Sequence, residues 1–221
     1  MSLLEAGKST LSAPWVYTLY QRVLGAPRCH RRFMESCVRP KPGDRVVDLG
    51  CGVGAGIEHL PPCVFYVGVD ISKEYVEAAR AKFGHRGTFV CASVDAVDLS
   101  RFAQLDVAMA FGVLHHLDDV TASAMVRLVG GALRPGGRLV TIDPCRVANE
   151  PCLARILMDH DRGRYVRTAQ AYRDLLTPHG HVKTEVVYDM LRVPYPQMVA
   201  TLTFTAARNG RGDLSPSVER L

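Results

Sequence analysis

A glycine-rich segment, Gly50-Cys51-Gly52-Val53-Gly54, is a candidate ligand-binding loop. It follows an apolar run that ends at Leu49 and precedes a stretch able to open a helix. At such a position glycines let backbone N–H groups approach a ligand closely. The glycines alone do not select the ligand, because a dinucleotide fingerprint also fits Gly50, Gly52 and Ala55.

Two carboxylates separate the possible ligands. Asp48, at the end of the apolar run, would repel a pyrophosphate but attract the ammonium of a methionine moiety. Asp70 lies at the end of the next apolar run and is placed to accept hydrogen bonds from both hydroxyls of a ribose; capping the following helix is its alternative role, which Ser72 could also fill. None of the eight tyrosines has the lysine four positions on that single-domain dehydrogenases use. These residues favour S-adenosylmethionine over NAD.

A histidine pair, His115 and His116, follows the apolar run 105–110. Methyl transfer from a sulfonium is an in-line displacement, so alignment supplies much of the acceleration. A base is needed only if the acceptor is a hydroxyl or an ammonium, and one of these histidines is our candidate. Hydrogen bonding to the loop backbone is an equally good interpretation of the pair. Asp143, at the end of a later apolar run, points to the same edge or merely ends its strand.

The segment 158–167 is dense in polar groups, and we expect it to bind the acceptor through His160, Arg162 and Arg167. Guanidinium groups pair bidentately with carboxylates and phosphates. Such a run of charged residues more often forms a solvated turn, here at the end of a helix near Gly163.

Short β-branched runs alternate with amphipathic segments between Arg45 and Asp143, which is typical of βαβ units in a parallel sheet. The expected strands are 45–49, 64–69, 87–91, 105–110, 138–142, 182–190 and 198–204. The expected helices are one ending at Gly25, 28–38, 72–83 and 121–133, with a mostly helical, polar segment over 145–178.

The 221 residues suit one globular domain. We expect a helical lid over 1–40, a catalytic domain over 41–208 with a substrate-side insert at 145–180, and a disordered tail over 209–221. The seven cysteines contain no Cys-x-x-Cys pair, which argues against a zinc site and a disulfide framework, and we expect no metal. We expect no membrane span and no secretory signal, and a cytoplasmic monomer or homodimer. The net charge of +5 is mild.

Four ordered segments resemble the class I S-adenosylmethionine-dependent methyltransferases: VVDLGCG, YVGVDIS, LDVAMAFGVLHHL and LRPGGRLVTIDP. The resemblance spans roughly residues 43–144 and is greatest to the small-molecule branch of ubiquinone and menaquinone biosynthesis enzymes. It implies an α/β, Rossmann-like, doubly wound sheet of seven strands, mostly parallel with an antiparallel last strand, and an N-terminal helical lid.

The resemblance also implies roles for individual residues. Asp48, Gly50, Cys51 and Gly52 would lie at the methionine part, Asp70 at the ribose, and Ile71 at the adenine. Family members often have an aspartate where this chain has Ser93, so Ser93 and Val94, or the nearby Asp95, would have to serve the adenine. Phe111 would border the transferable methyl, and Tyr17 and Tyr20 would close over the ligand.

The function expected from these residues is methylation of an unidentified small molecule. A nucleic-acid methyltransferase is one alternative, with Arg28, Arg31, Arg32 and the 162–167 cluster contacting phosphates. The segment Phe111-Gly112-Val113-Leu114 lacks the Asn/Asp-Pro-Pro-aromatic motif of base methylation, which makes a nucleic-acid partner unlikely. A protein that binds S-adenosylmethionine without catalysis is the other alternative.

Overall fold

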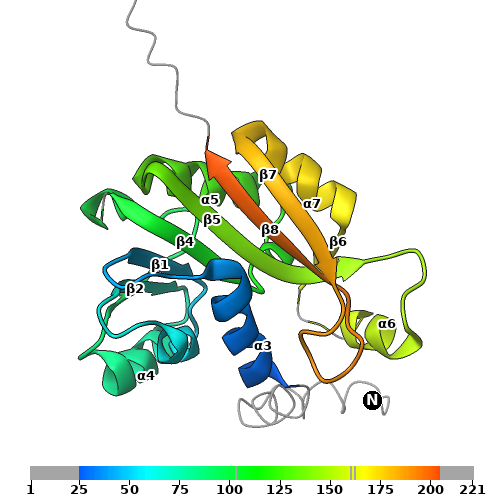
Figure 1. Ribbon diagram of the computed structural model, residues 1–221, viewed down its shortest axis with the longest axis horizontal. Helices are drawn as coiled ribbons and strands as arrows, with labels where there is room; N and C mark the ends of the chain where they lie inside the picture. The colour runs from blue at the N-terminus through cyan, green and yellow to red at the C-terminus, as the bar shows by residue number, and fades with distance from the viewer. Residues whose placement is uncertain (1–24, 103, 160, 162, 205–221) are drawn as a thin grey trace, which may run out of the picture.

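The computed structural model describes residues 25–204 except 103, 160 and 162, and these form one twisted sheet with helices on both faces (Figure 1). The strands follow the order β3-β2-β1-β4-β5-β8-β7, with a short β6 beside β5. Their bounds are β1 Arg45–Leu49, β2 Phe65–Asp70, β3 Thr88–Cys91, β4 Leu105–Phe111, β5 Leu133–Arg146, β6 Arg167–Thr168, β7 Gly180–Val187 and β8 Gln197–Phe204. The α-helices are α3 Ala26–Arg32, α4 Lys73–Phe83, α5 Asp119–Ala132, α6 Cys152–Asp159 and α7 Ala169–Leu176.

Strands β1 to β5 run parallel to one another in the sheet, so their carboxyl ends share one edge. The strand β1 lies in the middle of this part, with Asp48 opposite Gly68 of β2 and opposite Met109 of β4. The strand β8 is antiparallel to both β5 and β7. The predicted doubly wound sheet with an antiparallel last strand is therefore confirmed.

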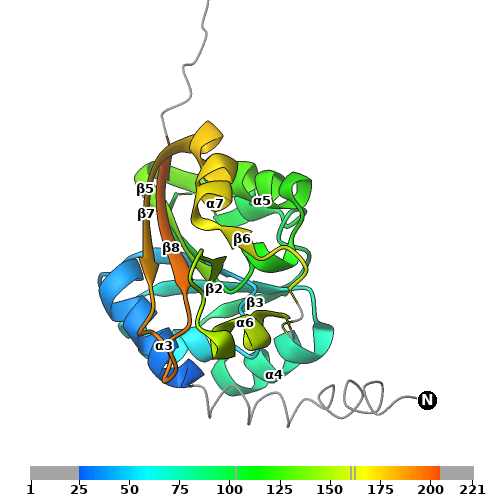
Figure 2. The ribbon, with the colours of Figure 1, turned by 90° about the vertical axis from the view of Figure 1, so that its right-hand side faces the viewer.

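The central strands are continuous apolar runs because both of their faces are covered. Val46, Val47 and Leu49 of β1 are fully buried. One apolar cluster packs α5 and α7 against the sheet, and a second packs α3 and α4. Figure 2 shows α3 on one side of the sheet and α5 and α7 on the other.

Helix starts follow local hydrogen-bonding signals. The Ser72 side chain accepts a hydrogen bond from the Tyr75 N–H and caps α4, as predicted. The helix α5 begins two residues earlier than expected, because the Asp118 side chain caps it by accepting from the Thr121 N–H. The predicted helix 28–38 is α3 followed by a π-helical turn, η1, at Phe33–Val38.

Three other predicted elements differ in extent. The strand β5 continues to Arg146, because it pairs with β8 as far as Pro144 and with β6 at Cys145 and Arg146. The segment after the glycine-rich loop forms only a 3-10 turn, η2, at Ala55–His59, and Pro61 follows, whose ring is incompatible with a continuing helix. The helical segment expected over 145–178 is broken into α6, β6 and α7.

No helix among residues 25–204, as far as they are described, combines the length and apolarity needed to cross a membrane. The expected lid residues 1–24 and the tail 209–221 lie outside the described residues.

Candidate functional site

The glycine-rich loop is tied to the end of β2 by its backbone. The N–H groups of Gly50 and Cys51 both donate to the carbonyl oxygen of Val69, at 2.7 and 3.0 Å. Gly50 has a φ of +71°, and a Cβ there would lie 2.6 Å from Cγ2 of Val113, so the loop requires a glycine. A Cβ on Gly52 would meet nothing within 4 Å, which leaves this part of the loop open to a ligand.

Asp70 connects the loop to the start of α4. Its Oδ2 accepts a hydrogen bond of 2.8 Å from the Gly52 N–H, and its Oδ1 accepts one of 2.8 Å from the Ser72 N–H. Ser72, and not Asp70, provides the side-chain cap of α4. The structure thus brings Asp70 to the open part of the loop, and its contact with a ribose stays a prediction.

Asp48 lies beneath the loop with only 4% of its surface exposed. Its Oδ2 accepts a hydrogen bond of 2.7 Å from the Tyr66 hydroxyl. Burial raises the pKa of Asp48 to about 7, although the Tyr66 hydrogen bond lowers it. The described contacts place Asp48 as a support of the loop, and its nearness to the ammonium of a methionine moiety stays a prediction.

Next to Asp70, Ile71 is a large apolar side chain that is 74% exposed. Ser93, at the end of β3, donates its hydroxyl hydrogen to Asp95, and Val94 beside it is buried. The role of Ile71, Ser93 and Val94 at an adenine ring stays a prediction.

Phe111, the last residue of β4, has an aromatic partner from the N-terminal part of the described chain. The ring of His30 in α3 stacks on it with centroids 3.8 Å apart, and Phe33 contacts it edge-on at 5.5 Å. His30 is not among the predicted site residues, because no local motif marks it and only the packing of α3 against the sheet brings it to Phe111.

His115, in the short 3-10 turn Leu114–His116 after β4, is buried and held by Asp143 at the end of β5. Asp143 Oδ1 lies 2.9 Å from Nδ1 of His115 and also accepts from the His115 backbone N–H at 3.1 Å. Asp143 is fully buried, and its Oδ2 has no hydrogen-bond partner in the described part of the chain. Asp143 therefore does more than end its strand, because it fixes the orientation of the histidine ring.

The other ring nitrogen of His115 faces the loop after α6. Nε2 lies 3.3 Å from Oδ1 of Asp161, whose side chain is 28% exposed. The same Oδ1 accepts from the Gly163 N–H at 2.7 Å. A Cβ on Gly163 would lie 1.9 Å from Cδ2 of His115, so only glycine lets this loop pack against the ring.

The two carboxylates dominate the protonation of His115. Burial of the ring lowers the pKa of His115, but the hydrogen bonds and charges of Asp143 and Asp161 outweigh burial and raise it to about 9. In turn, the hydrogen bond with His115 holds the pKa of Asp161 below its usual range, against the effect of its own burial. The second histidine, His116, is exposed, and its ring centroid lies 4.1 Å from that of His115.

Arg167, predicted to bind the acceptor, has its guanidinium engaged within the protein. It donates to the carbonyl oxygens of Leu114, Leu117 and Tyr165 and to the carboxylate of Asp119. A buried guanidinium with this many acceptors cannot also form a bidentate pair with an acceptor without losing them. The structure assigns Arg167 to holding the turn that carries His115. The other predicted acceptor ligands, His160 and Arg162, and the lid residues Tyr17 and Tyr20 lie outside the described residues.

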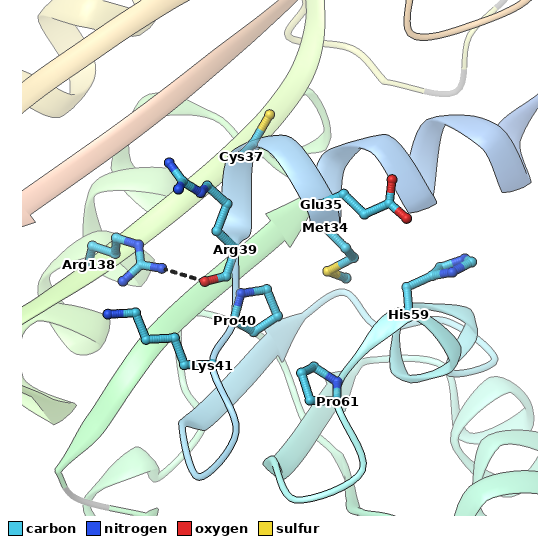
Figure 3. Close-up of a pocket in the computed structure, with 9 residues that line it drawn as sticks. All are labelled: Met34, Glu35, Cys37, Arg39, Pro40, Lys41, His59, Pro61 and Arg138. Carbon is cyan, nitrogen blue, oxygen red and sulfur yellow. Dashed lines mark hydrogen bonds between the residues drawn. The ribbon is translucent and has the colours of Figure 1, made fainter.

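A hollow of ≈ 740 Å³ lies away from these residues, where the end of η1 meets the start of β5 (Figure 3). Figure 3 shows Arg39, Lys41 and Arg138 on one side of it and His59 on the other. The Arg138 guanidinium donates to the Val38 carbonyl oxygen at 2.6 Å. None of the predicted site residues lines this hollow.

Comparisons with known proteins identify a methyltransferase domain in the chain. Residues 47–139 match a family described as a methyltransferase domain. The chain is 37% identical over 120 residues to the O-methyltransferase cnsE of Penicillium expansum, covering 51% of this chain and 42% of that protein. It is 32% identical over 139 residues to the ubiquinone/menaquinone biosynthesis C-methyltransferase UbiE of Geobacter sulfurreducens, covering 58% and 53% of the two chains. The chain thus spans about half the length of these relatives.

Among solved structures, the fold is similar to magnesium protoporphyrin IX methyltransferase from Synechocystis PCC 6803 with bound S-adenosylhomocysteine. The TM-score is 0.63 at 19% identity, and the likeness covers 90% of this chain and 98% of that one. At this identity the likeness shows the shared fold alone.

Proposed function

The chain belongs to the class I S-adenosylmethionine-dependent methyltransferases, and on that premise we propose that it methylates a small molecule bound beside His115. The observation that carries the proposal is the ring of His115, fixed by buried Asp143 at the carboxyl edge of the sheet. In open α/β sheets this edge is where ligands bind.

The residues at the loop fit the cofactor. Gly52 leaves open space at the loop, Asp70 offers a carboxylate for two hydroxyl groups, and Ile71 presents an exposed apolar side chain. We assign the methionine part to the Gly50–Gly52 segment, the ribose to Asp70, and the adenine to Ile71 with Ser93 and Val94. When bound, S-adenosylmethionine supplies a methyl group already activated for displacement.

The side chains near His115 would act on the acceptor. Because Nδ1 is held by Asp143, only Nε2 can meet an acceptor, and Asp161 must give up its contact for this to happen. Asp143 and Asp161 raise the pKa of His115 to about 9, so the ring must first lose its proton as Asp161 moves away. The neutral ring of His115, with His116 beside it, is then our candidate for receiving the proton of a hydroxyl or ammonium acceptor. Phe111, with His30 stacked on it, would border the reacting groups.

Binding of the cofactor is tested by calorimetric titration of the full chain with S-adenosylmethionine and S-adenosylhomocysteine. We expect saturable binding that weakens about 10- to 100-fold in Asp70→Ala, because a charge-assisted hydrogen bond to two hydroxyls is lost. Asp98→Ala is the matched control, since Asp98 is an exposed carboxylate away from the loop that accepts hydrogen bonds from Ser100. Equal binding by the wild type and Asp70→Ala would refute the assignment of the loop.

The class of acceptor is tested by transferring a tritiated methyl group to fractionated cell extract, with and without nuclease and protease treatment. We expect label in the small-molecule fraction, resistant to both treatments. Nuclease-sensitive label would favour a nucleic-acid acceptor, and intact cofactor binding with no label in any fraction would favour a binding protein without catalysis.

A further inference from the structure

Three side chains at the acceptor side of the site have the donor atoms of a metal centre. His115, His116 and Asp161 each offer one ligand atom, and these atoms all lie within 4.8 Å of one another. We propose that His115, His116 and Asp161 bind a divalent transition-metal cation, with two imidazole nitrogens and one carboxylate oxygen as ligands.

The distance between the donor atoms of His115 and Asp161 suits a shared cation. Nε2 of His115 and Oδ1 of Asp161 are 3.3 Å apart, which is long for a strong hydrogen bond. Two ligands that each bind a metal at about 2.1 Å with tetrahedral geometry are separated by about 3.4 Å. A cation can therefore replace the proton between Nε2 and Oδ1 with little movement of either side chain, and the His116 ring must move toward them.

The surroundings of His115 resemble those of a metal-binding histidine. Its Nδ1 lies 2.9 Å from the carboxylate of Asp143, which has no exposed surface. A carboxylate on the far nitrogen fixes the ring and makes the near nitrogen a better ligand. The backbone N–H of His115 also donates to Asp143, so the ring and its turn are held together.

The loop that carries Asp161 is shaped for the same contact. Gly163 donates its N–H to Oδ1 of Asp161 and packs its backbone against the His115 ring. The Tyr165 N–H then donates to the carbonyl oxygen of His115 at 2.9 Å. These hydrogen bonds keep the carboxylate within reach of Nε2.

The charges of the cluster favour a divalent cation. A cation bound at Nε2 displaces the proton of His115, and with both imidazoles then neutral, Asp143 and Asp161 leave two negative charges at the cluster. The cation of Arg167, which lies behind the same turn, is already paired with Asp119. Two histidines and one carboxylate suit zinc, manganese, iron or cobalt ions better than magnesium or calcium, which prefer oxygen ligands.

A cation held by three protein ligands keeps open positions, and these would take oxygen atoms of the acceptor. The role of the cation rests on the proposed function, and it names an oxygen-bearing acceptor as the substrate class. With the cation bound, His115 is a ligand; without it, His115 remains the candidate base. The proposal departs from the expectation of no metal, which rested on cysteine spacing and took no account of histidines and carboxylates far apart in the chain.

The experiment is a calorimetric titration of the full chain with Co²⁺, together with its visible spectrum, which distinguishes nitrogen and oxygen ligands from the thiolates of exposed cysteines. We expect one equivalent to bind, and we expect affinity to fall at least about 10-fold in His116→Ala and in Asp161→Asn. Asp159→Asn and His59→Ala are matched controls that should bind as the wild type does.

Each outcome has one meaning when S-adenosylhomocysteine binding is measured on the same samples. No Co²⁺ binding with normal S-adenosylhomocysteine binding overturns the metal site and leaves the proposed function standing. Co²⁺ binding unchanged in both ligand variants, or a thiolate spectrum, also overturns it. If the wild type does not bind S-adenosylhomocysteine, the proposed function is refuted. A Co²⁺ spectrum of nitrogen and oxygen ligands would still support the metal site in that case, and a thiolate spectrum would overturn it.

Discussion

The two halves of the carboxyl edge are built in different ways. The cofactor half uses Asp48, the Gly50–Gly54 loop and Asp70, which all lie between β1 and the end of β2, and the loop N–H groups donate to Val69 and Asp70. The acceptor half joins His115, Asp143 and Asp161, which come from three separate segments. The first half is specified by local sequence, whereas the second exists only once the sheet has formed. A change in one half should therefore leave the other nearly intact, and each prediction below tests that independence.

The largest effect is expected for Gly163→Ala. A Cβ would lie 1.9 Å from the His115 ring, so either the ring or the loop must move. A misplacement of about 1 Å in a reacting constellation can cost about 100-fold in rate. We expect methyl transfer to fall by about that factor while S-adenosylhomocysteine affinity, measured by calorimetry, is unchanged. Gly131→Ala is the control, since a Cβ on Gly131 meets nothing within 4 Å and, like Gly163, Gly131 has no positive φ. A parallel loss of cofactor affinity would show that the halves are coupled.

For Gly50→Ala we expect the opposite pattern, in which cofactor affinity falls and the His115 side of the site is unchanged. Its Cβ would collide with Val113, and the residue needs a φ of +71°. We expect S-adenosylhomocysteine affinity to drop about 10- to 100-fold, since the strained conformation costs on the order of 1 to 3 kcal/mol. The double variant Gly50→Ala with Val113→Ala should recover part of the affinity, because it removes the clash and leaves the strain. Co²⁺ binding should not change, and a loss of it would contradict the independence of the halves.

Arg167→Met tests how the turn that carries His115 is held. The variant keeps much of the volume but removes hydrogen bonds to three carbonyl oxygens and to Asp119. We expect the free energy of unfolding to fall by about 2 to 4 kcal/mol, as for other buried charged groups that lose their partners. Denaturant unfolding measures it, with Arg173→Met as a surface control. If the variant and the wild type have the same free energy of unfolding, Arg167 does not stabilise the turn that carries His115.

Asp48→Asn should have the smallest effect, and it is visible only as a pH dependence. Burial raises the pKa of Asp48 to about 7 in the folded chain, so folding favours its protonated form. The contribution of this group is therefore most favourable below the pKa of the unfolded chain and is lost as pH rises from about 4 to about 7. We expect the wild type to lose about 1 kcal/mol or more of stability across that window relative to Asp48→Asn. Parallel pH profiles of the two proteins would contradict a raised pKa.

The sequence predicted the sheet well, because strands and helix caps depend on local patterns. Apolar runs become strands, and Ser72 caps its helix as predicted. The acceptor half was only partly predictable. His115 was named, but its pairing with Asp143 and Asp161 depends on β4, β5 and the loop after α6 meeting in space. Arg167 was taken for an acceptor ligand because a guanidinium that holds a turn and one that holds a substrate look identical in sequence.

The pairing of β6 with β5 has a consequence for how this protein can change. Cys145 lies opposite Arg167 and Arg146 opposite Thr168, so the chain leaves the sheet and returns to it at neighbouring points. The residues between these two points form a connection whose two ends are held next to each other by the pairing of β5 with β6. Closing a longer loop costs little additional entropy once its ends are held. Segments of other lengths and compositions can therefore be exchanged at this point without disturbing the sheet; under the proposed function, such an exchange would alter acceptor choice and leave the Gly50–Gly54 loop unchanged.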